Sequence, residues 1–286
     1  MRINNVTVLG AGILGTQIAF QIAYSGVPVS IYDIKKEVTT NAKATFAKLA
    51  EIYTVEVPGA ANGKAEAALG RITYFFDLSA AVEDADLVIE SVPENLQIKR
   101  DAFTRLAMVA PERTIFATNS STLRLSDLMH STGRPGRFLG LHFANKIWLA
   151  NTAEVMGTEQ TDPEIFSAVL DFASRIGMVS VPLYKEKPGY ILNSLLLPLL
   201  VAGMDLAEGG YADISNVDKV WQIATGAAAG PFQILDIIGL PTAYRILLDG
   251  DQQSRRLAQW LKENYIDNGK LGIEIGEGFY KYSNVR

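Results

Sequence analysis

Apolar runs and amphipathic segments alternate along the first two thirds of the chain. Residues 6–9 form a short β-branched apolar run, and residues 16–24 follow with apolar positions at helical spacing. The alternation then repeats. The expected strands are 27–32, 71–76, 86–92, 114–118, 138–143, 152–156 and 179–183, with helices expected at 36–69, 77–84, 94–108 and 163–176. This order favours an α/β fold with a parallel sheet.

A glycine-rich turn separates the first expected strand from the first expected helix. Its spacing, G-x-G-x-x-G, is typical of a dinucleotide-binding strand–turn–helix unit. The first glycine permits a tight turn, the second lets the backbone approach a pyrophosphate, and the third lets helix and strand pack closely. The pyrophosphate would bind the free N–H groups at the helix N-terminus. The predicted cofactor-binding residues here are Gly10, Gly12, Ile13, Leu14 and Gly15.

An acidic residue follows the second expected strand. Asp33 lies 18 residues after Gly15, where a carboxylate can accept the two hydroxyls of the adenosine ribose. A 2′-phosphate would meet a like charge, so Asp33 favours NAD over NADP, although Lys35 and Lys36 weaken that preference. The alternative is a glycine turn in another kind of α/β protein, with Asp33 on its surface. We predict NAD as the cofactor.

The pattern changes at residues 185–189, which read Lys-Glu-Lys-Pro-Gly. Every later periodic segment has helical spacing. We therefore predict a Rossmann-type NAD-binding domain at 1–187, followed by an all-α domain at 188–286. The segment 36–69 is longer than a single crossover helix requires, so it predicts a helical insertion in the first domain.

Composition narrows the range of partners. The 286 residues carry a net charge of −5 without a basic stripe, so we expect neither a nucleic-acid nor a membrane partner. The chain has no cysteine, which excludes disulfides and Cys-ligated metals, and we predict no metal site. The longest apolar run, 195–204, is too short to span a bilayer. Because the start of the chain lacks a signal-peptide pattern, we expect a cytoplasmic protein.

One of the two histidines lies at the carboxyl end of an expected strand. A dehydrogenase needs a group that takes a proton as hydride leaves the same carbon, and histidine suits that task. His142 is our candidate, because His130 falls at a helix end. Glu154, twelve residues on, could bind the other ring nitrogen and fix its tautomer. The alternative is a core histidine hydrogen-bonded to the backbone.

Further motifs follow in order along the whole chain. After the glycine turn and Asp33 come 86–90, 93–96, 118–121, 140–145, 153–155, 188–193, 230–240 and 276–282. With these motifs in this order, the chain resembles the L-3-hydroxyacyl-CoA dehydrogenase family from end to end. The resemblance implies NAD-dependent oxidation of a short-chain 3-hydroxyacyl-CoA, such as 3-hydroxybutyryl-CoA, to the 3-oxo compound.

The resemblance also implies the catalytic roles. His142 would remove the proton of the 3-hydroxyl group, and Glu154 would orient it. Ser120 and Asn193 would hold the substrate oxygen, and Asn145 would line the same site. Because Asn193 belongs to the helical domain, the active site is expected in the cleft between the domains.

The resemblance assigns further residues to the cofactor and a surface to assembly. Glu94 and Lys99 match positions that approach the nicotinamide ribose, and Asn119 is assigned to cofactor binding. The helical domain is expected to form a homodimer interface, which its long apolar helix suits.

The chain departs from the family pattern on the substrate side. Ala144 and Lys146 stand where the family usually has Phe and Pro, and Trp148 follows soon after. Ser194 replaces the usual Arg. The residues that contact CoA in the family do not align onto Leu49 and its neighbours. Lys146 is therefore either a substrate contact or an exposed loop lysine.

Three functions remain open from the sequence. The main prediction is an NAD-dependent 3-hydroxyacyl-CoA dehydrogenase. The alternative is a dehydrogenase of a free 3-hydroxy acid, of the sugar-acid or carnitine type. The third is a non-catalytic relative that kept the fold, as in crystallins, which the intact catalytic set argues against.

Overall fold

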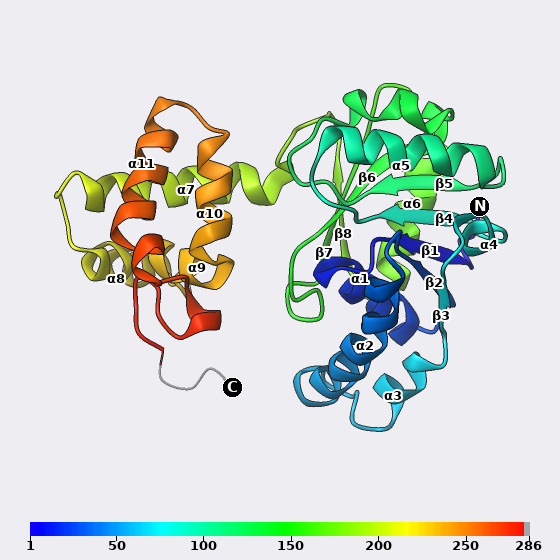
Figure 1. The fold of residues 1–286 in the computed structure, drawn as a ribbon, viewed down its shortest axis with the longest axis horizontal. Helices are drawn as coiled ribbons and strands as arrows, with labels where there is room; N and C mark the ends of the chain where they lie inside the picture. The colour runs from blue at the N-terminus through cyan, green and yellow to red at the C-terminus, as the bar shows by residue number, and fades with distance from the viewer. Residues whose placement is uncertain (283–286) are drawn as a thin grey trace. The chain divides into compact units, whose positions relative to one another are not determined.

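The computed structural model describes residues 1–282, which belong to two compact units, Met1–Ile191 and the residues from Leu192 onward (Figure 1). The division falls inside helix α7 (Tyr190–Glu208), whereas the predicted boundary follows Lys187. The difference arises because the chain enters α7 directly after the Pro-Gly break. The first residue of that helix, Tyr190, is only 1% exposed and packs in the core of the first unit.

The first unit is built on one eight-stranded sheet with the order β3–β2–β1–β4–β5–β6–β7–β8. The strands are β1 (Val6–Leu9), β2 (Val29–Tyr32), β3 (Ile72–Phe75), β4 (Leu87–Glu90), β5 (Ile115–Thr118), β6 (Phe138–Phe143), β7 (Thr152–Gly157) and β8 (Val179–Leu183). Strand β1 pairs in parallel with both β2 and β4. The strand order reverses direction there, and in such sheets dinucleotides bind outside the carboxyl ends of these strands.

Strands β6 and β7 run antiparallel, which corrects the expectation of a wholly parallel sheet. The connection between them, residues 144–151, is too short for a parallel crossover, which needs a dozen or more residues. This reversal matters for the site, because it places His142 directly opposite Glu154 in the register of the two strands.

Helices cover both faces of the sheet (Figure 1). Residues of α1 (Ile13–Tyr24), α2 (Lys36–Glu56), α3 (Lys64–Leu69) and α6 (Pro163–Arg175) share one core cluster, and those of α4 (Leu78–Val82) and α5 (Leu96–Val109) share another. The α2–α3 pair is the predicted helical insertion. Its inward face carries Phe46 and Tyr53, both fully buried, which pack against Phe20 of α1. Three unpredicted 3-10 helices, Leu125–Asp127, Met129–Thr132 and Pro135–Arg137, connect β5 to β6.

The second unit is helical, as predicted. After α7 come α8 (Ile214–Thr225), α9 (Pro231–Ile238), α10 (Leu240–Leu248) and α11 (Gln252–Asn264), followed by the short 3-10 helices Ile266–Asn268 and Ile273–Ile275. Its core includes Leu200, Met204, Phe232, Leu235, Leu257 and Leu261. Helix α7 is long and apolar enough to cross a membrane by length and composition alone, a test that core helices of soluble proteins also pass.

Candidate active site

The glycine turn after β1 has the conformation that its sequence requires. Gly10 has φ +98°, and a Cβ there would collide with the backbone oxygen of Ser91. A Cβ on Gly15 would collide with the backbone oxygen of Gly10, so the third glycine lets α1 pack against the turn. By contrast, Gly12 faces open space and caps α1 without a side-chain hydrogen bond. The turn therefore offers free N–H groups to a pyrophosphate.

Asp33 connects the end of β2 to this turn. Its Oδ2 accepts a hydrogen bond from the Ala11 amide at 3.0 Å, and its Oδ1 accepts one from the Lys35 amide, also at 3.0 Å. A carboxylate oxygen has a second lone pair. The two oxygens can therefore still accept ribose hydroxyls, as predicted for NAD.

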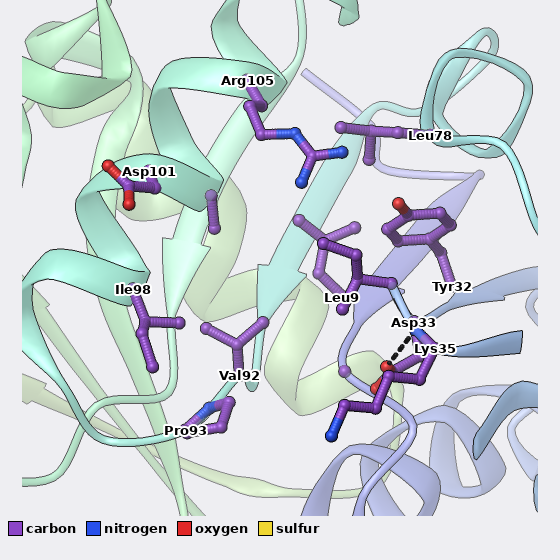
Figure 2. Close-up of a pocket in the computed structure, with 13 residues that line it drawn as sticks. Leu9, Tyr32, Asp33, Lys35, Leu78, Val92, Pro93, Ile98, Asp101 and Arg105 are labelled. Carbon is purple, nitrogen blue, oxygen red and sulfur yellow. Dashed lines mark hydrogen bonds between the residues drawn. The ribbon is translucent and has the colours of Figure 1, made fainter. Parts of the chain in front are cut away.

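A cavity of about 440 Å³ opens beside Asp33 at the carboxyl ends of β1, β2 and β4 (Figure 2). Its lining is mainly apolar, with Leu9, Ile34, Leu78, Val92, Ile98 and Ala102 among the wall residues. An apolar cavity next to a carboxylate that can accept ribose hydroxyls suits a purine ring. The glycine turn, Asp33 and this cavity together fit the pyrophosphate, ribose and adenine of NAD.

His142 and Glu154 form a buried pair across β6 and β7. The Nδ1 atom of His142 lies 2.9 Å from Oε2 of Glu154, and the two residues are 4% and 5% exposed. The other carboxylate oxygen, Oε1, accepts a hydrogen bond from the Ile191 amide at 2.8 Å. The carboxylate thus fixes the orientation of the imidazole and leaves Nε2 to face the reactants.

Two residues near His142 escaped the sequence analysis. The Oγ atom of Ser121 lies 3.0 Å from Nε2 of His142. On one face of the imidazole, the ring of Tyr190 stacks with its centroid 4.5 Å away. Burial and the carboxylate of Glu154 raise the pKa of Tyr190, so its phenol stays protonated. The Pro-Gly-Tyr motif marked this tyrosine but did not indicate its partner.

The serine beside the imidazole is Ser121, and not the predicted Ser120. The hydroxyl of Ser120 points elsewhere and donates to Oε1 of Glu94 at 2.6 Å. Two adjacent serines in a loop leave strand periodicity unable to decide between them. Asn119, assigned to the cofactor, here accepts a hydrogen bond from the Phe143 amide at 2.9 Å and joins β5 to β6.

Glu94 and Lys99 lie together beyond the end of β4. The Nζ atom of Lys99 is 2.7 Å from Oε1 of the buried Glu90 and 3.4 Å from Oε2 of Glu94. Burial opposes ionisation of Glu94, but the ammonium of Lys99 and hydrogen bonds from Ser120 and Thr122 outweigh it and lower the pKa of Glu94. Lys99 is 1% exposed, so in this structure it neutralises carboxylates.

The loop after β6, where the chain departs from the family pattern, is hydrogen-bonded to side chains of α1 and α2. Lys146 has a left-handed φ of +57°, and its amide donates to Oε1 of Gln17 at 2.8 Å. The indole of Trp148 donates to Oε2 of Glu56 at 2.6 Å. Asn145 and Lys146 are exposed, so both can face a ligand.

Two lysines of the insertion lie over tyrosine rings. The ammonium of Lys43 lies 5.2 Å from the ring centre of Tyr74, and that of Lys64 lies 4.1 Å from the ring centre of Tyr24.

Asn193 lies on the part of α7 that belongs to the second unit, and its role stays a prediction. Among residues 1–282, no cluster of three or more His, Cys, Asp or Glu side chains could hold a metal ion.

Comparison with known proteins gives matches over nearly the whole chain. Residues 5–187 match the family model "3-hydroxyacyl-CoA dehydrogenase, NAD binding domain", and residues 189–282 match the model of the C-terminal domain. The mitochondrial hydroxyacyl-coenzyme A dehydrogenase of Rattus norvegicus is 34% identical over 98% of this chain and 91% of its own length. A probable 3-hydroxybutyryl-CoA dehydrogenase of Deinococcus radiodurans is 32% identical over 96% of this chain and 99% of its own.

A solved structure is more similar still. A diketoreductase, described as catalysing reactions of dicarbonyl compounds, is 57% identical and superposes with a TM-score of 0.96. The match covers 99% of this chain and 100% of the diketoreductase.

Proposed function

Because the chain belongs to the 3-hydroxyacyl-CoA dehydrogenase family and is thus an NAD-dependent oxidoreductase, we propose that it acts on a short-chain 3-hydroxyacyl-CoA. It interconverts the 3-hydroxy and 3-oxo forms of this substrate. The observation that carries the proposal is the row of three groups Ser121, His142 and Glu154, joined at 3.0 and 2.9 Å.

The three groups have separate tasks in oxidation. Ser121 binds the 3-oxygen of the substrate and holds it near Nε2 of His142. His142 takes the hydroxyl proton at Nε2 as the C3–H bond breaks. NAD, held at the glycine turn and Asp33, would supply the acceptor for the hydride that leaves C3. Glu154 stabilises the imidazolium that forms, because its carboxylate already faces Nδ1 at 2.9 Å. In the reverse reaction His142 returns the proton to the oxygen.

Turnover with a CoA thioester tests this function. Purified protein should oxidise NADH when acetoacetyl-CoA is added. The variant His142→Gln should lose roughly 10² to 10⁴ in kcat if the imidazole is the base. No turnover by the unchanged protein would contradict the proposed substrate, and an unchanged rate in His142→Gln would contradict the proposed base.

A second candidate substrate is a dicarbonyl compound without CoA. The 57% identical diketoreductase supports it, and a 3-oxoacyl thioester is itself a 1,3-dicarbonyl, so the same three groups serve both. The insertion also supports it, since Lys43 and Lys64 lie on tyrosines and Glu56 adds negative charge beside Trp148. Neither arrangement favours the phosphates of CoA.

The two candidates differ in a measurable ratio. We would compare kcat/KM for acetoacetyl-CoA with kcat/KM for an alkyl ester of the same 3-oxo acid. A strong preference for the thioester supports the first candidate, and a preference for the ester supports the second.

We also propose that the second unit forms a homodimer. Several large apolar side chains of this unit are exposed, including Leu195 at 70%, Val220 at 68% and Ile223 at 74%. Monomeric proteins seldom expose large contiguous apolar patches. Sedimentation equilibrium of the full chain tests the proposal, which a monomer at micromolar concentration would contradict.

A further inference from the structure

The cavity beside Asp33 contains one guanidinium that the proposed chemistry does not use. Arg105 of α5 lines this cavity. Its side chain is exposed and forms no hydrogen bond or ion pair with another residue in the described range 1–282. Arg100 on the same helix differs, because its Nε donates to the backbone oxygen of Asp127 at 2.8 Å. Arg105 is therefore available to a ligand in the cavity.

The order of the cofactor groups places adenine close to Arg105. The pyrophosphate belongs at the glycine turn and the ribose at Asp33, so the purine must lie farther along the cavity. Figure 2 shows the guanidinium of Arg105 extending from α5 toward Leu9 and Leu78, on the side away from Lys35. A purine against this wall would have an apolar surface on one side and the guanidinium within reach.

The other charged groups that line the cavity either have hydrogen-bond partners or lie at its ribose end. Asp33 accepts two backbone hydrogen bonds. Oδ1 of Asp101 accepts a hydrogen bond from the side-chain Nε2 of Gln97 at 2.8 Å. Lys35 follows Asp33 and stands at the ribose end (Figure 2). Arg105 thus remains as the planar cation at the purine end.

We infer that the guanidinium of Arg105 stacks on the adenine ring of NAD and contributes to its affinity. An arginine side chain is planar and weakly hydrated, and it stacks readily on flat π-systems. The inference rests on NAD binding alone and not on the proposed substrate. It makes Arg105 a binding residue for the adenosine half of the cofactor, more than a turn of helix away from the groups at the nicotinamide end.

Binding measurements without substrate test this role. Isothermal titration of Arg105→Leu should show Kd for NADH raised by about 3- to 30-fold, the range expected for a cation–π contact. ADP-ribose, which keeps the adenosine and the pyrophosphate but lacks the nicotinamide, should lose the same factor. Reduced nicotinamide mononucleotide, which lacks adenosine, should bind unchanged. Leucine keeps apolar contact, so it isolates the guanidinium.

Matched variants complete the experiment. Arg105→Lys keeps the charge and should recover part of the affinity, whereas Arg100→Leu on the same helix should leave Kd for NADH unchanged. Unchanged affinity in Arg105→Leu, or an equal loss for reduced nicotinamide mononucleotide, would overturn the inference. A loss confined to NADPH would place Arg105 at a 2′-phosphate and would overturn the adenine contact as well.

Discussion

The Oγ atom of Ser121 lies 3.0 Å from Nε2 of His142, on the imidazole nitrogen that Glu154 leaves free. Ser121 is positioned from its other side by Glu94, whose Oε1 accepts a hydrogen bond from the Ser121 amide at 3.1 Å. The same carboxylate oxygen accepts hydrogen bonds from the side chains of Ser120 and Thr122. One acidic group thus sets the conformation of the whole loop that carries the reactive hydroxyl.

The two adjacent serines should respond differently to substitution. Ser121→Ala removes the hydrogen-bond donor at the substrate oxygen and should lower kcat by about 10² to 10³. Ser120→Ala removes a hydrogen bond to a carboxylate and should cost about 1.5–3 kcal/mol of stability, with a smaller effect on kcat. Steady-state kinetics and urea unfolding of both variants separate these effects. Loss of kcat in Ser120→Ala alone would favour the sequence-based choice of serine.

Gly140, in the same strand β6 as His142, leaves room for the side chain of Tyr190. A Cβ on Gly140 would collide with Oη of Tyr190 and lie 3.3 Å from Cδ1 of Leu125. Gly140→Ala should therefore cost about 1–3 kcal/mol and disturb the stacking on His142, lowering kcat. Phenylalanine at 190 lacks Oη, so the double variant Gly140→Ala/Tyr190→Phe should lose less than the two single variants together. Additive losses in thermal unfolding and kcat would rule out this steric coupling.

The lowered pKa of Glu94 makes part of the stability depend on pH. Its folded-state pKa lies below the ordinary value of 4.5. The contribution is therefore complete above that value and is lost as the pH falls through the folded-state pKa. The stability difference between the unchanged protein and Glu94→Gln should shrink below pH 4.5 in urea unfolding. Glu51→Gln on an exposed position of α2 is the control, and an equal pH dependence in both variants would contradict the prediction.

The fold was largely predictable because periodicity reports burial. Each strand of the sheet was expected near its observed position, and the G-x-G-x-x-G turn located the start of α1. The antiparallel step between β6 and β7 was missed because both strands are apolar runs with no sign of direction. Only the length of the loop between them, residues 144–151, carried that information.

The candidate site was predictable where the sequence offered a single residue of the required type for a given role. His142 and Glu154 were paired correctly from the ends of two strands. Ser121 was missed because the orientation of a loop serine depends on hydrogen bonds from Glu94, which lies 27 residues earlier in the chain. The assignment of Lys99 to the nicotinamide ribose came from the family resemblance and stays a prediction. Nothing in the sequence indicated that the Lys99 ammonium also lies 2.7 Å from the buried Glu90.

A buried carboxylate, that of Asp236, holds the C-terminal turn of the second unit in place. Asp236 is fully buried and accepts hydrogen bonds from the Phe279 amide at 2.8 Å and from Oη of Tyr282 at 2.8 Å. Burial raises the pKa of Asp236 despite these bonds. Tyr282→Phe removes one donor to this carboxylate and should cost about 1–3 kcal/mol at pH 7.

The stability that Tyr282→Phe loses should depend on pH. Without the phenol, the folded-state pKa of Asp236 rises further above its unfolded value. Stability is then lost as the pH rises between the two values, so the deficit of Tyr282→Phe should be smaller near pH 4 than at pH 7. Tyr211→Phe is the control, because that side chain is 78% exposed. Urea unfolding at both pH values decides: a deficit that is equal at pH 4 and pH 7 would mean that the phenol supports packing and not the charge of Asp236.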